Sequence, residues 1–138
     1  MTENIIHVEY QATGASTSVN EMGMREMQAR AYAARNAQYL LLKAPPASGK
    51  SRALMFIALD KLRSGQVSKV IVAVPERSIG GSFKNTALSS HGFHSDWSVE
   101  PQNNLCLPGG ENSKVAALGK FLDSSDRAFW HSNNNFRN

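Results

Sequence analysis

The chain has 138 residues, 41% of them apolar, which suits one folded domain with a hydrophobic core. Its net charge of +4 is uneven, with 11 basic against 6 acidic residues over 1–90 and 4 against 5 over 91–138, which favours a polyanionic ligand. There is no membrane-spanning apolar run and no secretory signal, and the single cysteine, Cys106, cannot form an internal disulfide. We therefore expect a cytoplasmic protein without a membrane partner.

The first part of the chain alternates short apolar runs with helical patterns. Apolar and β-branched runs predict strands at Asn4–Tyr10, Tyr39–Lys43 and Lys69–Val74. Apolar residues at helical spacing predict helices at Glu21–Arg35, Gly49–Arg63 and Arg77–Leu88. Strands that alternate with helices indicate an α/β fold with a mostly parallel sheet.

The second part is less regular. Short strands are predicted at Asp96–Val99, Asn104–Leu107 and Arg127–Trp130, and a helix capped by Asn112 is predicted to run to Leu122. The polar residues 131–138 are expected to be a frayed tail. We treat residues 1–138 as a single, partial domain.

The segment between the second strand and the second helix has the layout of a phosphate-binding loop. An apolar strand stops, a proline-containing turn follows, and Gly49-Lys50-Ser51 opens a helix. In such loops a lysine reaches the outer phosphates, a hydroxyl ligates magnesium, and the helix dipole favours the anion. We therefore predict that ATP and Mg2+ bind here, with Ser51 on the metal. The predicted binding residues are Ala44, Pro45, Pro46, Ala47, Ser48, Gly49, Lys50, Ser51 and Arg52.

The stretch LLKAPPASGKSRALMFIALDKL resembles motif I of superfamily 2 helicases, whose loops often begin with Ala-Pro as this one does at Ala44. The resemblance extends from about residue 24 to residue 83, and more loosely to residue 122. It implies the N-terminal part of a helicase motor domain, with an incomplete, three-layer P-loop NTPase sandwich as its fold.

Two further segments carry this resemblance. Gln28 lies 22 residues before Lys50, which is close to the usual interval for the family's glutamine that reads the adenine edge. A side-chain amide can donate to and accept from adenine. The segment VIVAVPERSIGGSF resembles motif Ia, which touches the nucleic-acid backbone. The resemblance implies DNA or RNA contacts at Arg77, Ser78, Gly80 and Gly81.

The family's later motifs are missing from this sequence. No apolar strand ends in Asp-Glu, and the second helicase lobe is not present. Hydrolysis needs a carboxylate on magnesium and a group that orients water, so we expect ATP binding with negligible turnover. This pattern indicates a truncated or decayed helicase product, unless a partner chain supplies the missing motifs.

Two alternatives stay open. One is a small phosphotransferase, although no arginine-rich lid follows the loop. The other is a non-enzymatic interaction module that associates with itself or completes its sheet with a partner, since an open sheet edge can pair with another chain.

Overall fold

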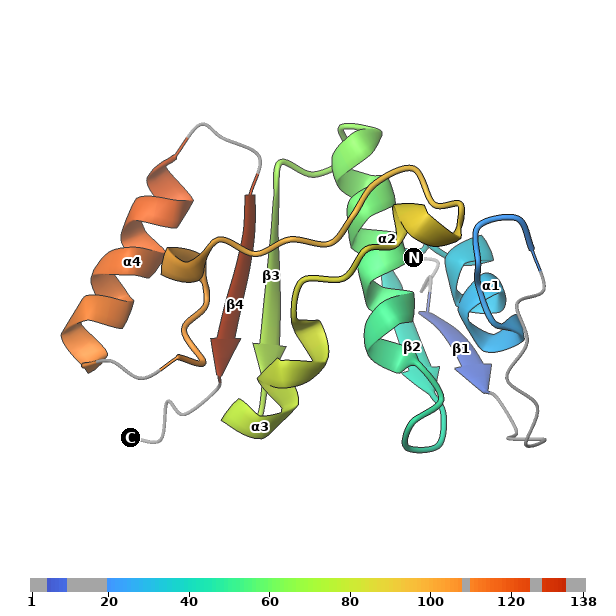
Figure 1. Cartoon of the computed structure of the whole chain (residues 1–138), viewed down its shortest axis with the longest axis horizontal. Helices are drawn as coiled ribbons and strands as arrows, with labels where there is room; N and C mark the ends of the chain where they lie inside the picture. The colour runs from blue at the N-terminus through green and yellow to red at the C-terminus, as the bar shows by residue number, and fades with distance from the viewer. Residues whose placement is uncertain (1–4, 10–19, 108–109, 125–127, 134–138) are drawn as a thin grey trace. The chain divides into compact units, whose positions relative to one another are not determined.

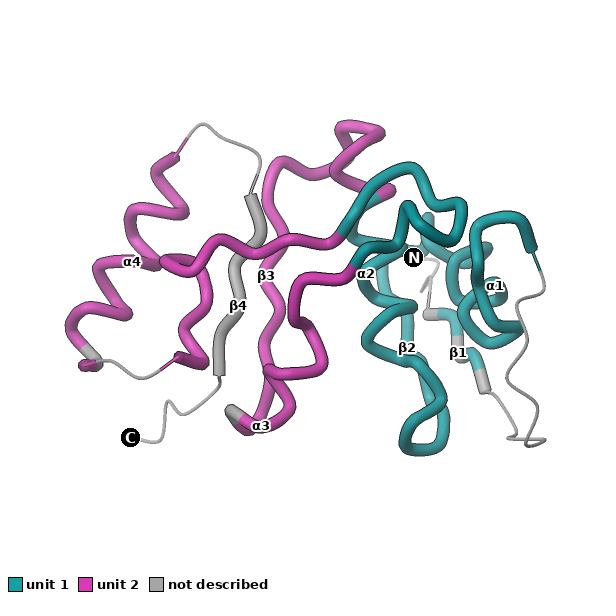
Figure 2. The backbone as a smooth tube through the Cα atoms, viewed as in Figure 1, with its two compact units in different colours: residues 1–59, 87–96 teal, residues 60–86, 97–138 magenta. Residues whose placement is uncertain are grey.

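A computed structural model of the chain describes residues 5–9, 20–107, 110–124 and 128–133. The chain divides into two compact units (Figure 2). Unit 1 comprises residues 1–59 and 87–96, and unit 2 comprises residues 60–86 and 97–138. Helix α2 (Lys50–Arg63) begins in unit 1 and ends in unit 2.

Unit 1 is built on two parallel strands, β1 (Ile5–Glu9) and β2 (Tyr39–Lys43), which lie side by side in Figure 1. In their register, Ile5 lies opposite Tyr39. Parallel strands need a crossover connection, and helix α1 (Glu26–Ala33) lies within it. The predicted strand at Tyr39–Lys43 is confirmed at both ends, and α2 begins one residue later than predicted.

Helices α1 and α2 cover one face of this strand pair. Partly buried Leu40 and Leu42 of β2 pack against a cluster of buried side chains contributed by the two helices, namely Met27, Ala31, Ala53 and Ile57. Burying an aliphatic side chain of this size contributes about 1.5–3 kcal/mol, so the cluster fixes both helices on the strands. The alternate residues of β2, Tyr39 and Leu41, are 60% and 57% exposed. The other face of β2 is therefore uncovered at these two positions.

Helix α1 is shorter than predicted, because the residues before it form a turn. The Asn20 side chain accepts hydrogen bonds from the backbone N–H groups of Met22 and Met24, both at 3.1 Å. Gly92 lies against this turn with φ at +101°, and a Cβ at Gly92 would lie 2.0 Å from the carbonyl oxygen of Glu21. Residues 87–96 thus belong to unit 1 through a backbone approach that only glycine permits.

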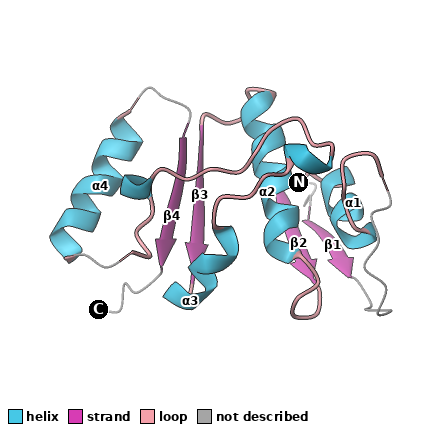
Figure 3. Ribbon diagram, in the orientation of Figure 1, coloured by secondary structure: helices cyan, strands magenta, loops and turns pink. Residues whose placement is uncertain are grey.

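Unit 2 contains a second parallel pair, β3 (Lys69–Val74) and β4 (Ala128–Asn133), shown with the other strands in Figure 3. Strand β3 has its predicted bounds. Strand β4 continues to Asn133, so the expectation of a frayed tail is wrong for residues 131–133, and residues 134–138 lie outside the described part.

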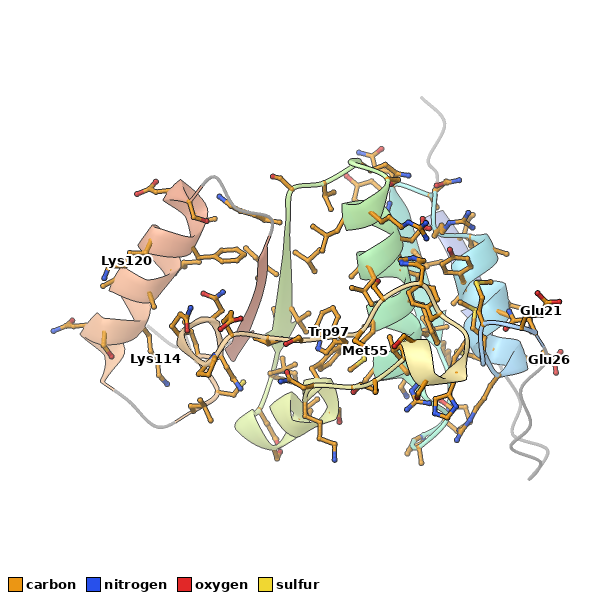
Figure 4. The ribbon with its side chains drawn as sticks, turned by 45° about the horizontal axis from the view of Figure 1, so that its top comes forward. Glu21, Glu26, Met55, Trp97, Lys114 and Lys120 are labelled. Carbon is orange, nitrogen blue, oxygen red and sulfur yellow. The ribbon has the colours of Figure 1, made fainter. Side chains whose placement is uncertain are left out.

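Helix α4 (Glu111–Asp123) is joined to the start of β3 by one side chain. The Lys69 ammonium donates to the carbonyl oxygen of Leu122 at 2.5 Å and lies 5.7 Å from the centre of the Phe121 ring. The N-cap of α4 is Gly110, so the prediction that Asn112 caps this helix is wrong. Figure 4 shows two other lysines of this helix, Lys114 and Lys120.

Three other predicted elements differ from the structure. The helix that begins at Arg77 ends at Gly80 as α3 and is followed by a 3₁₀ turn, Gly81–Phe83. The strand predicted at Asp96–Val99 is reduced to an isolated antiparallel bridge between Thr86 and Trp97. In the segment predicted as a strand at Asn104–Leu107, Asn104 is a single β-bridge residue, and residues 105–107 form a turn and a bend.

The bridge is held by one buried tryptophan. Trp97 is 1% exposed, and its indole N–H donates to the carbonyl oxygen of Phe83 at 2.9 Å. The backbone N–H of Thr86 also donates to the carbonyl oxygen of Trp97 at 2.9 Å. These hydrogen bonds prevent residues 83–86 from continuing the helix that the sequence predicts over this segment.

The three-layer sandwich stays a prediction, because the strands are described as two separate pairs, one in each unit. Within the described residues, no helix has both the length and the apolar character to cross a membrane.

Candidate phosphate-binding site

The loop between β2 and α2 is a tight turn with two left-handed residues. The backbone N–H of Ser48 donates to the carbonyl oxygen of Pro45 at 3.3 Å. Ala47 has φ at +60° and Gly49 has φ at +93°. A left-handed alanine costs about 1 kcal/mol, so packing or function must hold it in this conformation. Helix α2 then begins at Lys50, which directs its first backbone N–H groups toward the turn.

The Lys50 ammonium lies against the carbonyls at the start of this loop. It donates to the carbonyl oxygen of Ala44 at 2.5 Å and to that of Pro45 at 3.3 Å. The side chain is therefore folded over the loop and brings a positive charge to the N-terminal end of α2. A lysine on a flexible stem can exchange such carbonyl partners for an anion.

Ser48 carries an unsatisfied buried hydroxyl. The residue is 9% exposed, and its Oγ is the one buried side-chain polar atom without a hydrogen-bond partner in the part of the chain that the structure describes. Leaving such a group unpaired costs about 1–3 kcal/mol. A phosphate oxygen at the loop would supply the missing acceptor, so this atom fits a bound polyphosphate.

Helix α1 contacts the same loop through its first turn. The Gln28 side chain donates from Nε2 to the carbonyl oxygen of Gly49 at 3.1 Å, and its Oε1 accepts from the backbone N–H of Arg25 at 2.8 Å. Arg25 in turn donates from Nη1 to the carbonyl oxygen of Ala47 at 3.4 Å. The shape of the loop therefore depends on residues more than twenty positions earlier in the chain.

Arg25 was not among the predicted site residues. Its guanidinium adds a second cation beside the loop, because Nη1 lies 3.8 Å from the position that a Cβ on Gly49 would take. Arg25 is three residues before Gln28 at the start of a helix, and this i, i+3 spacing is the signal that could have identified it.

The remaining predicted residues of the loop lie along its rim and on the first turn of α2. Pro46 is exposed, and Ser51 and Arg52 are half-buried. In the described part of the chain, no group of three or more His, Cys, Asp or Glu residues is placed to hold a metal ion. The role of Ser51 as a magnesium ligand stays a prediction.

The predicted nucleic-acid contacts belong to unit 2, whereas the loop belongs to unit 1. Ser78 is exposed, and its hydroxyl donates to Oε2 of Glu76 at 3.3 Å. Gly80 and Gly81 have ordinary right-handed helical φ values of −55° and −60°. The side chain of Arg77 lies outside what the structure describes. Contact with DNA or RNA at these residues stays a prediction.

This chain is similar to a curated protein from a bacterium. The chain is 64% identical over 125 residues to "Putative ATP-dependent helicase YeeB" of Bacillus subtilis (strain 168). The match covers 91% of this chain and 21% of that protein, so the chain spans about a fifth of the relative's length. The chain is thus related to one part of a protein that carries a helicase name. It matches no protein-family model and no solved structure.

Proposed function

We propose that this chain is the triphosphate-binding part of a superfamily 2 helicase-like protein, with ATP and Mg2+ as its ligands. The observation that carries the proposal is the unpaired, buried hydroxyl of Ser48, in the loop that the Lys50 side chain contacts and that leads into α2. The related protein with a helicase name supports the same reading.

Each group at the loop has a role in this proposal. The first backbone N–H groups of α2 and the positive end of its dipole hold the phosphates. Lys50 leaves the carbonyls of Ala44 and Pro45 and pairs with the outer phosphates, and Ser48 donates its hydroxyl hydrogen. Ser51 ligates the magnesium ion, which neutralises part of the phosphate charge.

This chain alone should bind ATP without turning it over at a useful rate. Hydrolysis requires a carboxylate on the metal and a group that orients the attacking water, and the sequence contains no strand that ends in Asp-Glu. We propose that nucleic-acid contact, if it occurs, involves residues 77–81, and that further chain or a partner completes the motor.

Titration with a fluorescent ATP analogue, with and without Mg2+, tests the proposal. Lys50→Ala should weaken binding at least about tenfold, or about 1.4 kcal/mol, because it removes the cation at the phosphates. Lys61→Ala is the matched control, since Lys61 lies in the last turn of the same helix and donates to Gln66. Equal affinities for Lys50→Ala and the wild type would contradict the proposal.

A second candidate function is self-association, and the exposed face of β2 favours it. Tyr39 and Leu41 present apolar surface on a parallel strand, and parallel sheets are usually covered on both faces. Sedimentation velocity across a wide concentration range tests this candidate. A dimer that Leu41→Lys dissociates would support it, and a monomer at every concentration would exclude it.

A further inference from the structure

The oxygen and the nitrogen of the Gln28 side-chain amide each have a hydrogen-bond partner in the protein. Its oxygen accepts from the backbone N–H of Arg25 at 2.8 Å, and its nitrogen donates to the carbonyl oxygen of Gly49 at 3.1 Å. The amide nitrogen has a second hydrogen and the oxygen a second lone pair. Gln28 is only 2% exposed, and both of its polar atoms already have protein partners, in contrast to the unpaired hydroxyl of Ser48.

One of these two bonds belongs to helix α1 itself. Gln28 is the third residue of the helix, and Arg25 is its N-cap. A glutamine at this position commonly reaches back to the N-cap N–H, which has no partner within the helix. The oxygen of the amide is thus committed to helix capping, and the capping bond directs the nitrogen toward the loop.

The other bond depends on the absence of a side chain at Gly49. A Cβ at this position would lie 2.5 Å from Nε2 of Gln28, which is closer than real Cβ contacts. Gly49 also has φ at +93°, where an L side chain is strained. Gln28 and Gly49 therefore form a pair in which the small residue makes room for the amide of the large one.

We propose that Gln28 is a positioning residue of the phosphate loop, and that its amide does not select the base of a bound nucleoside triphosphate. Adenine and guanine differ in the donors and acceptors on their edges, and discrimination needs a protein group that can reach them. The buried amide cannot serve this purpose while it holds the loop. The inference rests on the proposed function of the loop, and it replaces the adenine-reading role that the sequence predicts for Gln28.

Competition binding against the fluorescent analogue tests the inference with three competitors: ATP, GTP and inorganic tripolyphosphate, each with Mg2+. The ratio of ATP to GTP affinity should be the same within about threefold in the wild type and in Gln28→Ala, because Gln28 acts on the phosphate loop and not on the base. Gln28→Ala should lower the affinities for ATP, GTP and tripolyphosphate by a similar factor, about fivefold or more. Glu26→Ala is the control, since Glu26 is an exposed residue of the same helix turn and is labelled in Figure 4.

Gln28→Met separates positioning of the loop from simple support of the fold. Methionine keeps the length and much of the packing of glutamine, but it cannot accept from the N–H of Arg25 or donate to Gly49. This variant should therefore regain part of the thermal stability lost in Gln28→Ala without regaining affinity for tripolyphosphate.

Several results would overturn the inference. A wild-type preference for ATP over GTP above about tenfold, lost in Gln28→Ala while tripolyphosphate binding is unchanged, would make Gln28 a base reader. Unchanged affinities in Gln28→Ala would exclude a positioning role. If Gln28→Ala does not fold, the ratio of ATP to GTP affinity in a second variant, Gln28→Met, decides whether Gln28 selects the base. If none of the three competitors binds, the proposed function fails together with the inference.

Discussion

Replacing Gly49 by alanine should destabilise the protein by about 2–3 kcal/mol. An alanine at φ of +93° carries roughly 1–2 kcal/mol of backbone strain. Its Cβ would lie 2.5 Å from Nε2 of Gln28, so the amide must move and its bond to the Gly49 carbonyl is lost. That hydrogen bond is worth about 1 kcal/mol. The affinity for Mg2+ and ATP should fall as well, because the loop loses its contact with α1.

The same substitution at Gly119 is the control, and its effect should have the opposite sign. Gly119 lies inside α4, and no heavy atom lies within 4 Å of the position that its Cβ would take. Alanine there should stabilise the protein by about 0.5–1 kcal/mol, since glycine is unfavourable in a helix interior. Urea denaturation followed by circular dichroism measures both variants. The reasoning is refuted if Gly49→Ala is as stable as the wild type, or if the two variants shift equally.

Three further variants test individual contacts. Ser48→Ala should raise the free energy of unfolding by about 1–2 kcal/mol, because it removes an unpaired buried hydroxyl. The same variant should bind tripolyphosphate more weakly. A lower free energy of unfolding would contradict the first expectation. Trp97→Phe should cost about 1–2 kcal/mol in thermal unfolding through the lost bond to Phe83, and an unchanged midpoint would argue against it. The backbone N–H of Ser89 holds the pKa of Asp96 below its ordinary value of 3.8. The ionised Asp96 carboxylate therefore stabilises the folded state at pH values above 3.8, and this stabilisation is lost as pH falls through the lower pKa of the folded state. Asp96→Asn should therefore reduce the acid sensitivity of unfolding, and an identical pH profile would exclude the effect.

The elements that the sequence predicted well are those whose ends are marked by backbone chemistry. Strands β2 and β3 have their predicted bounds, and each is followed within two residues by a proline that cannot continue a central strand. Helix α2 was predicted within one residue at its start, because a glycine precedes a continuous run of helix-forming residues. Local rules were enough here, since tertiary contacts agree with them.

The elements that were predicted wrongly are those where a distant contact overrides local preference. Residues 81–88 have no strong break after the two glycines, so a helix to Leu88 was a reasonable expectation. The buried indole of Trp97 instead bonds to Phe83 and pairs its backbone with Thr86, which ends the helical path. A contact between residues 14 positions apart leaves no periodic pattern in the sequence.

At the candidate site, the sequence indicates which residues lie at the loop but not which hydrogen bonds their side chains make. The pattern around Lys50 predicts a turn followed by a helix, as the structure has them, and the spacing to Gln28 singles out a residue that contacts this turn. What Gln28 bonds to depends on where α1 begins. The helix starts at Glu26 rather than at residue 21, which makes Gln28 its third residue and turns the amide oxygen back to the N-cap. A helix that began five residues earlier would place Gln28 in its interior, where the cap would not hold the amide oxygen. The start of α1, and with it the partner of the amide oxygen, is therefore set by the turn at Asn20, eight residues before the glutamine itself.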